Sequence, residues 1–336
     1  FHYLLNTFHH YASFLIIPQT EFIYQRNEFI YNIYMKTFEI IKVDPQGYCG
    51  GVLQAIAIAK KTRLENPDSR ITILGNLVHN QYVKKALSYD KLDTIEDKSK
   101  TRLELLDQIE EGIVIFTAHG ISQDVRQKAL NKGLKIIDAS CPFVLQTQKI
   151  IQQKLSEGFV IFYIGKYRHP EAEAIYSTSN KIYLIEKEED IPNGIQEPIF
   201  VTNQTTMSIF DIQYLFDAIK QAYPEAEFHD EICNATRIRQ QAILDLKNQN
   251  IDTLIVVGDP SSNNTKQLAN IGKKAEIKQV IRINDVNELN VDDLHEAWRI
   301  AITSGASTPT YLTNQVIEYL ENYPCQKPEI KIQDIL

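Results

Sequence analysis

Three of the four cysteines stand at a constant interval along the chain. Cys49, Cys141 and Cys233 are 92 residues apart, and each precedes a stretch with the apolar pattern of a helix. Free cysteines are often simple packing groups. Three matched thiols can instead hold zinc, exchange electrons or bind an iron–sulfur cluster. Cys325 lies outside the interval, and we expect it to take no part in this chemistry.

Polar side chains repeat with the cysteines, at the ends of two predicted strands in each interval. The first group follows its cysteine by 28 to 31 residues and consists of His79, His169, and Ser262 with Asn264. The second group follows by 64 to 74 residues and consists of His119, Thr205 and Ser307. Singly, such residues are often structural histidines, helix caps or turn residues. Together, their imidazole, hydroxyl and amide groups predict a site for an anion with many oxygen atoms.

The tripeptide His169-Pro170-Glu171 is the clearest candidate for acid–base chemistry. If Glu171 is enclosed, burial raises the pKa of its carboxyl group, which can then donate a proton near neutral pH. On an exposed helix N-terminus the same carboxylate would be a structural group that the helix dipole favours. The sequence leaves both interpretations open.

Two kinds of segment must position these residues. Short β-branched runs, such as 71–74, 113–116 and 160–164, alternate with amphipathic stretches such as 52–64 and 235–246. This alternation predicts an α/β fold with mainly parallel sheets and an active site beyond the carboxyl ends of the strands. The constant interval predicts three copies of one α/β unit. Arranged around an axis, these units would bring three thiolates to one point.

Composition excludes several classes of protein. The 336 residues include 43 acidic and 35 basic side chains, which give a formal charge of −8. This balance argues against a nucleic-acid or anionic-membrane binding protein. Four dispersed cysteines exclude a disulfide scaffold and predict a reducing, cytoplasmic location. Neither a nicotinamide fingerprint nor a phosphate-binding loop is present, and no apolar run reaches the length of a membrane span.

Residues 1–34 differ from the rest of the chain. They hold 10 of the 32 aromatic residues and 3 of the 8 histidines, and they precede Met35. They lack the basic start and unbroken apolar core of a secretory signal. We expect a leader translated from upstream sequence that takes no part in the fold. The alternative is an amphipathic arm that binds a membrane surface.

Nine short motifs resemble one known family. In order, from about Met35 to Leu320, they resemble 4-hydroxy-3-methylbut-2-enyl diphosphate reductase. The motifs are GYCGGV, LVHN, FTAHGIS, DASCPFV, RHPEAE, NQTTMS, DEICNATRIRQ, GDPSSNNTKQL and TSGASTP.

The resemblance implies a fold and a reaction. The fold is a trefoil of three similar α/β units around one central 4Fe–4S cluster. The reaction is the last step of the methylerythritol phosphate route to isoprenoids. In it, the hydroxyl group of 4-hydroxy-3-methylbut-2-enyl diphosphate is removed reductively to give isopentenyl and dimethylallyl diphosphates. Because the chain lacks a flavin or nicotinamide fingerprint, the resemblance implies a separate electron donor such as ferredoxin or flavodoxin.

The resemblance also implies a role for each candidate residue. Cys49, Cys141 and Cys233 would hold the cluster and leave one iron open. Glu171 would deliver protons, and Thr205 would hold the substrate hydroxyl near the open iron, with Thr206 close by. The groups that would bind the diphosphate are His79, His119, His169, Ser262, Asn264 and Ser307.

The expected units are residues 49–140, residues 141–230, and residues 35–48 together with 231–330. Three places depart from the family pattern, and one is Ala174–Ser177, which lacks a glycine that is common in the family. Arg168 stands where the family usually has glycine, and Asn263 stands where many members have serine. We therefore leave Asn263 out of the predicted diphosphate ligands.

Two other functions remain as alternatives. The first is a three-cysteine zinc- or redox-sensing protein without catalysis. The second is another reductase or dehydratase that uses the same cluster scaffold on a different phosphorylated alcohol.

Overall fold

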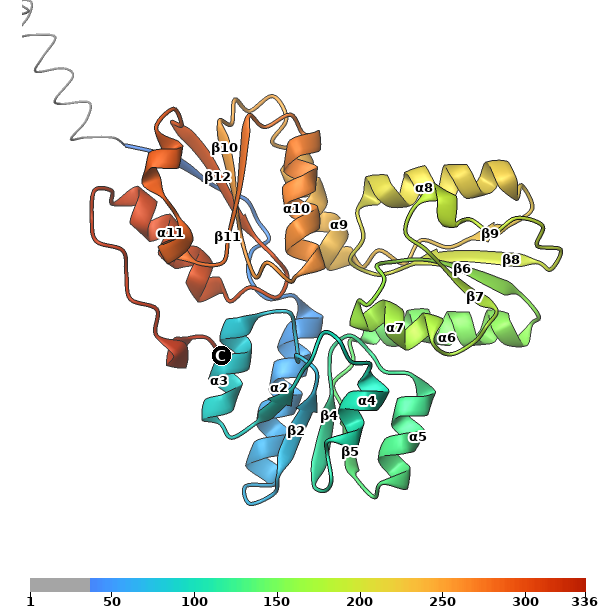
Figure 1. Ribbon diagram of the computed structural model, residues 1–336. Coiled ribbons are helices and arrows are strands. Elements are labelled where there is room, and N and C mark those ends of the chain that lie inside the picture. The colour runs from blue at the N-terminus through green and yellow to red at the C-terminus, as the bar shows by residue number, and fades with distance from the viewer. Residues whose placement is uncertain (1–36) are drawn as a thin grey trace, which may run out of the picture.

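Three parallel sheets, each with its own helices, form three lobes around a common centre (Figure 1). This computed structural model describes residues 37–336, so the predicted leader, residues 1–34, lies outside the described residues. Within residues 37–336 every strand pairing is parallel. The predicted fold class, three similar α/β units with mainly parallel sheets, is therefore confirmed.

The first lobe contains a sheet in the order β3-β2-β4-β5. Its strands are β2 (Ile71–Leu74), β3 (Asp93–Ile95), β4 (Ile113–Phe116) and β5 (Lys135–Asp138). The helices of this part of the chain are α2 (Gly50–Glu65), α3 (Gln81–Tyr89), α4 (Arg102–Asp107) and α5 (Gln123–Asn131).

The second lobe repeats this arrangement in the order β7-β6-β8-β9. Its strands are β6 (Val160–Ile164), β7 (Ile182–Ile185), β8 (Ile199–Asn203) and β9 (Glu227–Phe228). Its helices are α6 (Pro142–Ser156), α7 (Pro170–Tyr176) and α8 (Ile209–Ala222).

The third lobe joins the two ends of the described chain in the order β1-β12-β10-β11. Its strands are β1 (Glu39–Lys42), β10 (Thr253–Val257), β11 (Gln279–Ile283) and β12 (Arg299–Ser304). Its helices are α9 (Asn234–Leu244), α10 (Asn263–Lys274) and α11 (Thr310–Glu321). Short 3₁₀ helices cover Glu188–Asp190, Val286–Glu288, Val291–Leu294 and Ile332–Asp334. The predicted boundaries between the units stay a prediction.

The interior strands explain why the sequence forms these sheets. All four residues of β4 and all five of β6 are buried. Helices cover both faces of a parallel sheet, so its interior strands are apolar throughout instead of alternating. Burying each Val, Ile, Leu or Phe side chain contributes about 1.5–3 kcal/mol to stability. No helix among residues 37–336 is both long enough and apolar enough to cross a membrane.

The six interior strands deliver the predicted polar residues to the centre. β2, β4, β6, β8, β10 and β12 occupy the two interior positions of the three sheets. The residues that follow them, in the same order, are His79, His119, His169, Thr205, Ser262 and Ser307. Ligands of open α/β sheets bind beyond the carboxyl ends of the strands. This topology therefore turns three separate sheets toward one site.

Candidate active site

The three evenly spaced cysteines lie at equivalent places in the three lobes. Cys49, Cys141 and Cys233 are the N-cap residues of α2, α6 and α9, and each cap backbone is extended. All three line one cavity of about 100 Å³. A methyl group added at Gly51 would lie 2.5 Å from the sulfur of Cys141. A glycine is therefore required where the first helix approaches the second cysteine.

Every other predicted site residue lines the same cavity. These residues are His79, His119, His169, Glu171, Thr205, Thr206, Ser262, Asn264 and Ser307. Asn263, which was left out of the predicted ligands, also lines it. Cys325 is exposed and lies outside this wall. The cavity wall contains one carboxyl group, that of Glu171, and it has no lysine or arginine.

The surroundings of the thiols suit an anionic group. Burial raises the pKa of the Cys141 and Cys233 thiols. Hydrogen bonding acts in the opposite direction, with the Thr236 hydroxyl 3.2 Å from the Cys233 sulfur. The positive ends of the three helix dipoles also favour negative charge at these sulfurs. Because burial makes the Cys141 and Cys233 thiols costly to ionise, both are expected to gain from binding a metal group that stabilises their thiolates.

Arg239 adds a buried cation beside this sulfur cluster. Its side chain is 4% exposed, and its charge interacts with Cys49 and Cys233. One terminal nitrogen, Nη2, donates to the Gly47 carbonyl over 2.8 Å, while Nε has no partner among the described residues. A buried charge normally has a counter-charge. An anionic cluster on the three thiolates would supply it.

The three thiols of the cavity are the donors that a bound metal group would use. Within residues 37–336 no three His, Cys, Asp or Glu side chains are close enough together to hold one metal ion. In a 4Fe–4S cluster each cysteine binds a different iron, so the sulfurs remain further apart than the ligands of one ion. Three thiols in one cavity, with the buried cation of Arg239 beside them, have the donor chemistry that such a cluster needs.

The three histidines form a compact group in the cavity wall. The ring centres of His79 and His119 are 4.3 Å apart, and that of His169 lies 5.1 and 5.7 Å from them. Burial lowers the pKa of His79 to about 4, and it holds the pKa values of His119 and His169 well below the usual value. The Nε2 atom of His79 is buried and has no hydrogen-bond partner within residues 37–336. The rings are therefore neutral at pH 7, with one polar atom available for a ligand.

Glu171 and Thr205 form a buried pair opposite these groups. The Thr205 backbone nitrogen donates to one carboxyl oxygen over 2.7 Å, and its hydroxyl donates to the other over 3.0 Å. Glu171 is 2% exposed, and burial raises its pKa to about 7 although the bonds from Thr205 lower it. Of the two interpretations that the sequence left open, the structure has the enclosed carboxyl group.

Hydrogen bonds connect the polar turns and hold their side chains in place. Ser262 caps α10 by accepting from the backbone nitrogen of Thr265 over 3.3 Å. The Ser307 hydroxyl donates to the backbone carbonyl of His79 over 2.9 Å. Asn263 donates its amide to the Thr206 carbonyl and hydroxyl oxygens, at 2.9 and 3.2 Å. The third lobe is thus tied to the first and to the second at this site.

Comparison with known proteins places the chain in a family. The model of a family described as LytB protein matches residues 40–321. This chain belongs to the LytB protein family. The resemblance stated from the nine motifs is confirmed, since curated relatives in it are called 4-hydroxy-3-methylbut-2-enyl diphosphate reductase.

Two of these relatives come from Bacillus species. The reductase of Bacillus cytotoxicus is 46% identical over 296 residues, which cover 86% of this chain and 92% of the relative. The reductase of Bacillus pumilus is 46% identical over 288 residues, which cover 84% and 91%.

Solved structures show the same likeness. The E-1-hydroxy-2-methyl-but-2-enyl-4-diphosphate reductase from Plasmodium falciparum aligns with a TM-score of 0.79 at 29% identity, covering 88% of this chain and 95% of that one. A second structure, described as the terminal enzyme of the non-mevalonate pathway, aligns with a TM-score of 0.58 at 28% identity, covering 84% and 98%.

Arg168 has a backbone conformation that glycine adopts most easily. Its φ is +60°, in the left-handed region that costs a non-glycine residue about 1–3 kcal/mol. Its guanidinium carbon lies 5.5 Å from the centre of the Tyr167 ring, a cation–π contact that offsets part of this cost. The loop before His169 therefore keeps a backbone that glycine adopts freely, and His169 still caps α7.

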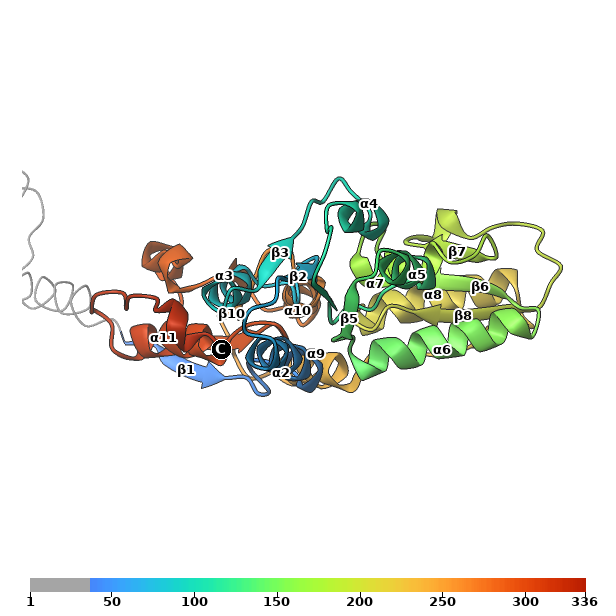
Figure 2. The same cartoon turned by 90° about the horizontal axis from the view of Figure 1, so that it is seen from below.

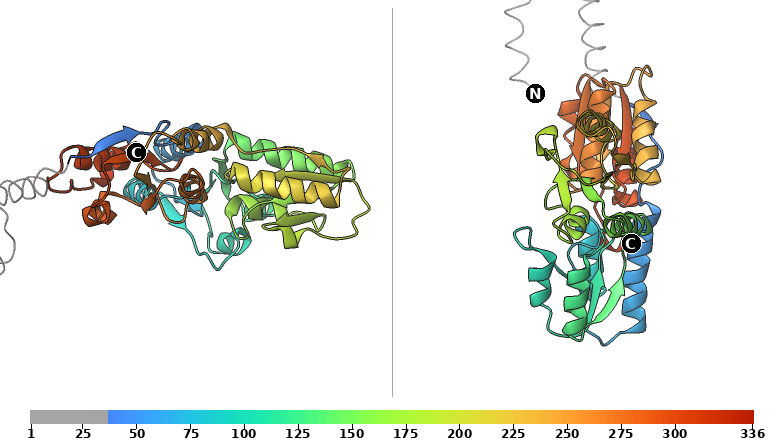
Figure 3. Two further views of the ribbon diagram at one scale, coloured as in Figure 1. Left: turned by 90° about the horizontal axis from the view of Figure 1, so that it is seen from above. Right: turned by 90° about the vertical axis from the view of Figure 1, so that its right-hand side faces the viewer.

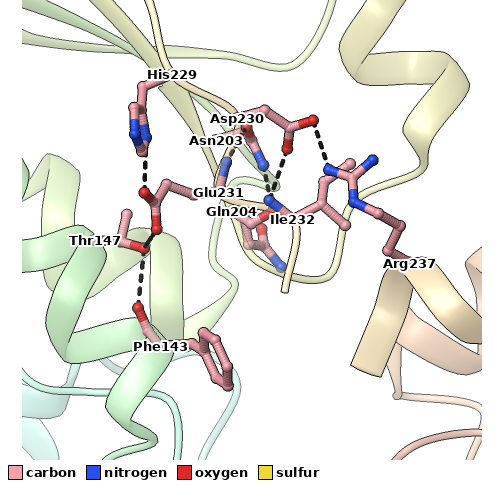
Figure 4. A network of polar contacts seen from close by, with 9 residues as sticks. All are labelled: Phe143, Thr147, Asn203, Gln204, His229, Asp230, Glu231, Ile232 and Arg237. Carbon is pink, nitrogen blue, oxygen red and sulfur yellow. Dashed lines mark hydrogen bonds and ion pairs between the residues drawn. The ribbon is translucent and has the colours of Figure 1, made fainter. Parts of the chain in front are cut away.

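A link between the segments of the second and third cysteines could not be foreseen from residue spacing. Buried Glu231 accepts from the Thr147 hydroxyl over 2.8 Å, and its other oxygen lies 2.8 Å from Nδ1 of His229 (Figure 4). Thr147 belongs to the helix that Cys141 begins, and Glu231 stands two residues before Cys233. A single carboxylate thus connects the segments that carry the two cysteines.

Arg239 was also missed as a separate functional residue. It lies six positions after Cys233, on the buried side of α9 with Thr236. The signal in the sequence was weak, because basic residues on helices usually face solvent. The available clue was that helical periodicity places this arginine on the buried face of the helix.

Proposed function

We propose that this protein removes the hydroxyl group of 4-hydroxy-3-methylbut-2-enyl diphosphate reductively, the last step of the methylerythritol phosphate pathway. Two electrons and two protons convert the substrate into water and either isopentenyl or dimethylallyl diphosphate. The observation that carries this proposal is one cavity that joins three cysteines, three histidines and a buried carboxyl group, in a chain of the LytB protein family.

Cys49, Cys141 and Cys233 are the residues that would hold a 4Fe–4S cluster. When bound, the cluster supplies electrons and an iron without a protein ligand, a Lewis acid for breaking the carbon–oxygen bond. The protein contributes three helix N-termini and the buried Arg239, which lower the cost of negative charge at the sulfurs. The helix N-termini and Arg239 thereby favour the negative charge that the sulfurs would carry as ligands of the cluster.

The diphosphate would bind among the histidines and the capped turns. Its ligands would be His79, His119, His169, Thr206, Ser262, Asn264 and Ser307. Since the wall contains neither lysine nor arginine, neutral donors, helix N-termini and protonated imidazoles must balance the charge of the diphosphate. Binding of the diphosphate orients the other end of the substrate toward the thiols.

Glu171 would donate the proton that turns the departing hydroxyl into water. Its pKa of about 7 keeps much of the group protonated at neutral pH. Thr205 donates to both carboxyl oxygens from its nitrogen and hydroxyl, so it fixes the orientation of the acid. The Thr205 hydroxyl would turn to the substrate hydroxyl as the second member of the proton-transfer group.

The pH dependence of turnover should reflect Glu171. Because burial raises its pKa to about 7, the protonated and active form is present below this pH and is lost above it. We expect kcat/KM, measured with a reduced viologen dye, to fall about tenfold per pH unit above pH 7. Thr205→Val removes a hydrogen bond that favours the carboxylate, so the fall should begin at higher pH. An unchanged profile in Thr205→Val would contradict this role.

Diphosphate binding should take up protons. The empty-site pKa of His79 is about 4, and a bound anion raises it, so affinity rises as pH falls. We expect calorimetry of inorganic diphosphate binding at pH 7, in two buffers of different ionisation enthalpy, to show uptake of about one proton. His79→Gln should reduce this uptake, whereas His295→Gln, at an exposed histidine, should not. Equal proton uptake by the wild type, His79→Gln and His295→Gln would exclude His79 as the group that takes up the proton.

We also propose that a ferredoxin- or flavodoxin-type protein in the cytoplasm supplies the electrons. The sequence contains no fingerprint for a bound nicotinamide or nucleotide. The three cavity cysteines must stay reduced to act as ligands, which a reducing compartment ensures.

Anaerobic purification followed by an activity assay tests the function. We expect a coloured protein that contains iron and sulfide and converts the hydroxylated diphosphate into both products with a reduced viologen dye. A colourless protein with stoichiometric zinc would contradict the proposal. A coloured protein that leaves this diphosphate unchanged but reduces another phosphorylated alcohol would instead identify a different reductase on the same scaffold.

A further inference from the structure

The three helices that begin at the cysteines present one exposed face. α2, α6 and α9 lie along the same edge of the molecule (Figures 2 and 3). The residues one, four, five and eight positions after each cysteine are exposed on all three helices, while the residue three positions after is buried. We call these twelve exposed positions the cysteine-helix face. The three N-cap cysteines line one cavity, so the face is formed by three helices that all begin at that cavity.

Each of the three helices carries a large exposed aliphatic residue on the cysteine-helix face. Leu53, Leu145 and Ile238 are 54%, 41% and 46% exposed. Phe143, at the first turn of α6 beside them, is 47% exposed. A single exposed apolar residue is ordinary, but one on the first turns of each of three helices that begin at the same cavity is the pattern of an interaction surface. Each of the three aliphatic side chains stands within about one and a half turns of a cysteine.

The charge of this face is opposite to that of the whole chain. The chain carries −8, yet none of the twelve positions holds Asp or Glu, and two hold Lys149 and Arg237. Arg237 pairs with Asp230 at 2.7 Å. Lys149 makes no ion pair among residues 37–336. The face therefore suits an acidic partner that carries an apolar contact area of its own.

We propose that the cysteine-helix face is the docking surface for an acidic one-electron carrier protein. This inference rests on the proposed function, because it assigns the route by which electrons reach the cysteine-bound group. Two carrier molecules in turn each lose one electron, and the two electrons are used in breaking the carbon–oxygen bond. Transient redox complexes are small, below about 1,200 Å² of total buried surface, so three helix starts provide enough area.

The geometry also explains why the apolar residues stay exposed. A carrier must bind, transfer its electron and leave, which requires a weak contact with fast association. Complementary charge raises the association rate, and exposed apolar side chains exclude water from the contact. A permanent interface would bury a larger and more apolar area.

Two variants test the face against a matched control on the same helix. Leu53→Glu and Ile238→Glu place negative charge in the centre of the face. Leu64→Glu makes the same change at an 80% exposed leucine of α2, about 16 Å further along the helix. Turnover is measured with a reduced viologen dye and, separately, with a reduced acidic ferredoxin. If Leu53→Glu or Ile238→Glu prevents folding, Lys149→Glu is measured in its place.

With ferredoxin we expect the KM for the carrier to rise about tenfold or more in Leu53→Glu and Ile238→Glu, and to stay unchanged in Leu64→Glu. With viologen all three variants should match the wild type. Raising the salt concentration should increase the wild-type KM for ferredoxin, because salt screens the charge attraction.

Other outcomes would overturn the inference. An unchanged ferredoxin KM in both variants means that the carrier docks elsewhere. If gel filtration shows a dimer that these variants dissociate while the ferredoxin KM stays constant, the face is an interface between copies of this chain. Absence of wild-type turnover with viologen would instead contradict the proposed function, so the two failures are distinguishable.

Discussion

Glu171→Gln should lower the turnover number about 10²- to 10⁴-fold, the range by which a positioned general acid accelerates a reaction. Glu171 is the one carboxyl group among the residues that line the cavity. Glutamine has the same shape, and its amide can keep both contacts with Thr205, so the fold and the cavity should remain. Glutamine, however, carries no acidic proton that it could donate to the departing hydroxyl. Rapid anaerobic kinetics with a reduced viologen measures the change.

The control for this result lies on the same helix. Glu173 is two residues further along α7, outside the cavity, where one carboxyl oxygen accepts from the backbone nitrogen of Arg102 over 3.0 Å. Glu173→Gln keeps a carbonyl oxygen for that bond and should retain wild-type turnover. Iron content and inorganic diphosphate affinity should be unchanged in both variants. Full turnover in Glu171→Gln would show that another group supplies the proton.

Cys233→Ser should abolish turnover, to below about one-thousandth of the wild-type value, because the cluster loses one of its three ligands. A serine hydroxyl does not ionise at neutral pH and is a poor ligand for iron. Iron and sulfide content should fall with the activity, as should the visible absorption of the purified protein. Urea unfolding under anaerobic conditions then separates loss of the cluster from loss of the fold.

The chain contains its own control for this experiment. Cys325 is exposed, and it lies outside the cavity that contains the other three cysteines. Cys325→Ser should keep the iron content, the absorption and the turnover of the wild type. Loss of the cluster in Cys325→Ser, or its retention in Cys233→Ser, would contradict the proposed ligand set.

Local patterns made much of the fold predictable. The interior strands are runs of β-branched and aromatic residues, such as β6, whose five residues are all buried. The edge strands were harder to foresee, since β9 has two residues and β3 begins with an exposed aspartate. An edge strand is defined by its pairing partner more than by its own composition.

The sequence by itself determined the repeat and the inventory of reactive groups. Three cysteines at one interval, with polar residues after each pair of strands, follow from residue types and spacing alone. The tertiary structure decided the state of those groups. The pKa of Glu171 and those of the histidines depend on how much water the surrounding lobes exclude. The same is true of Arg239, whose charge interacts with Cys49 and Cys233 because packing buries it beside them. Spacing is a property of the chain, whereas desolvation is a property of everything that packs around a residue.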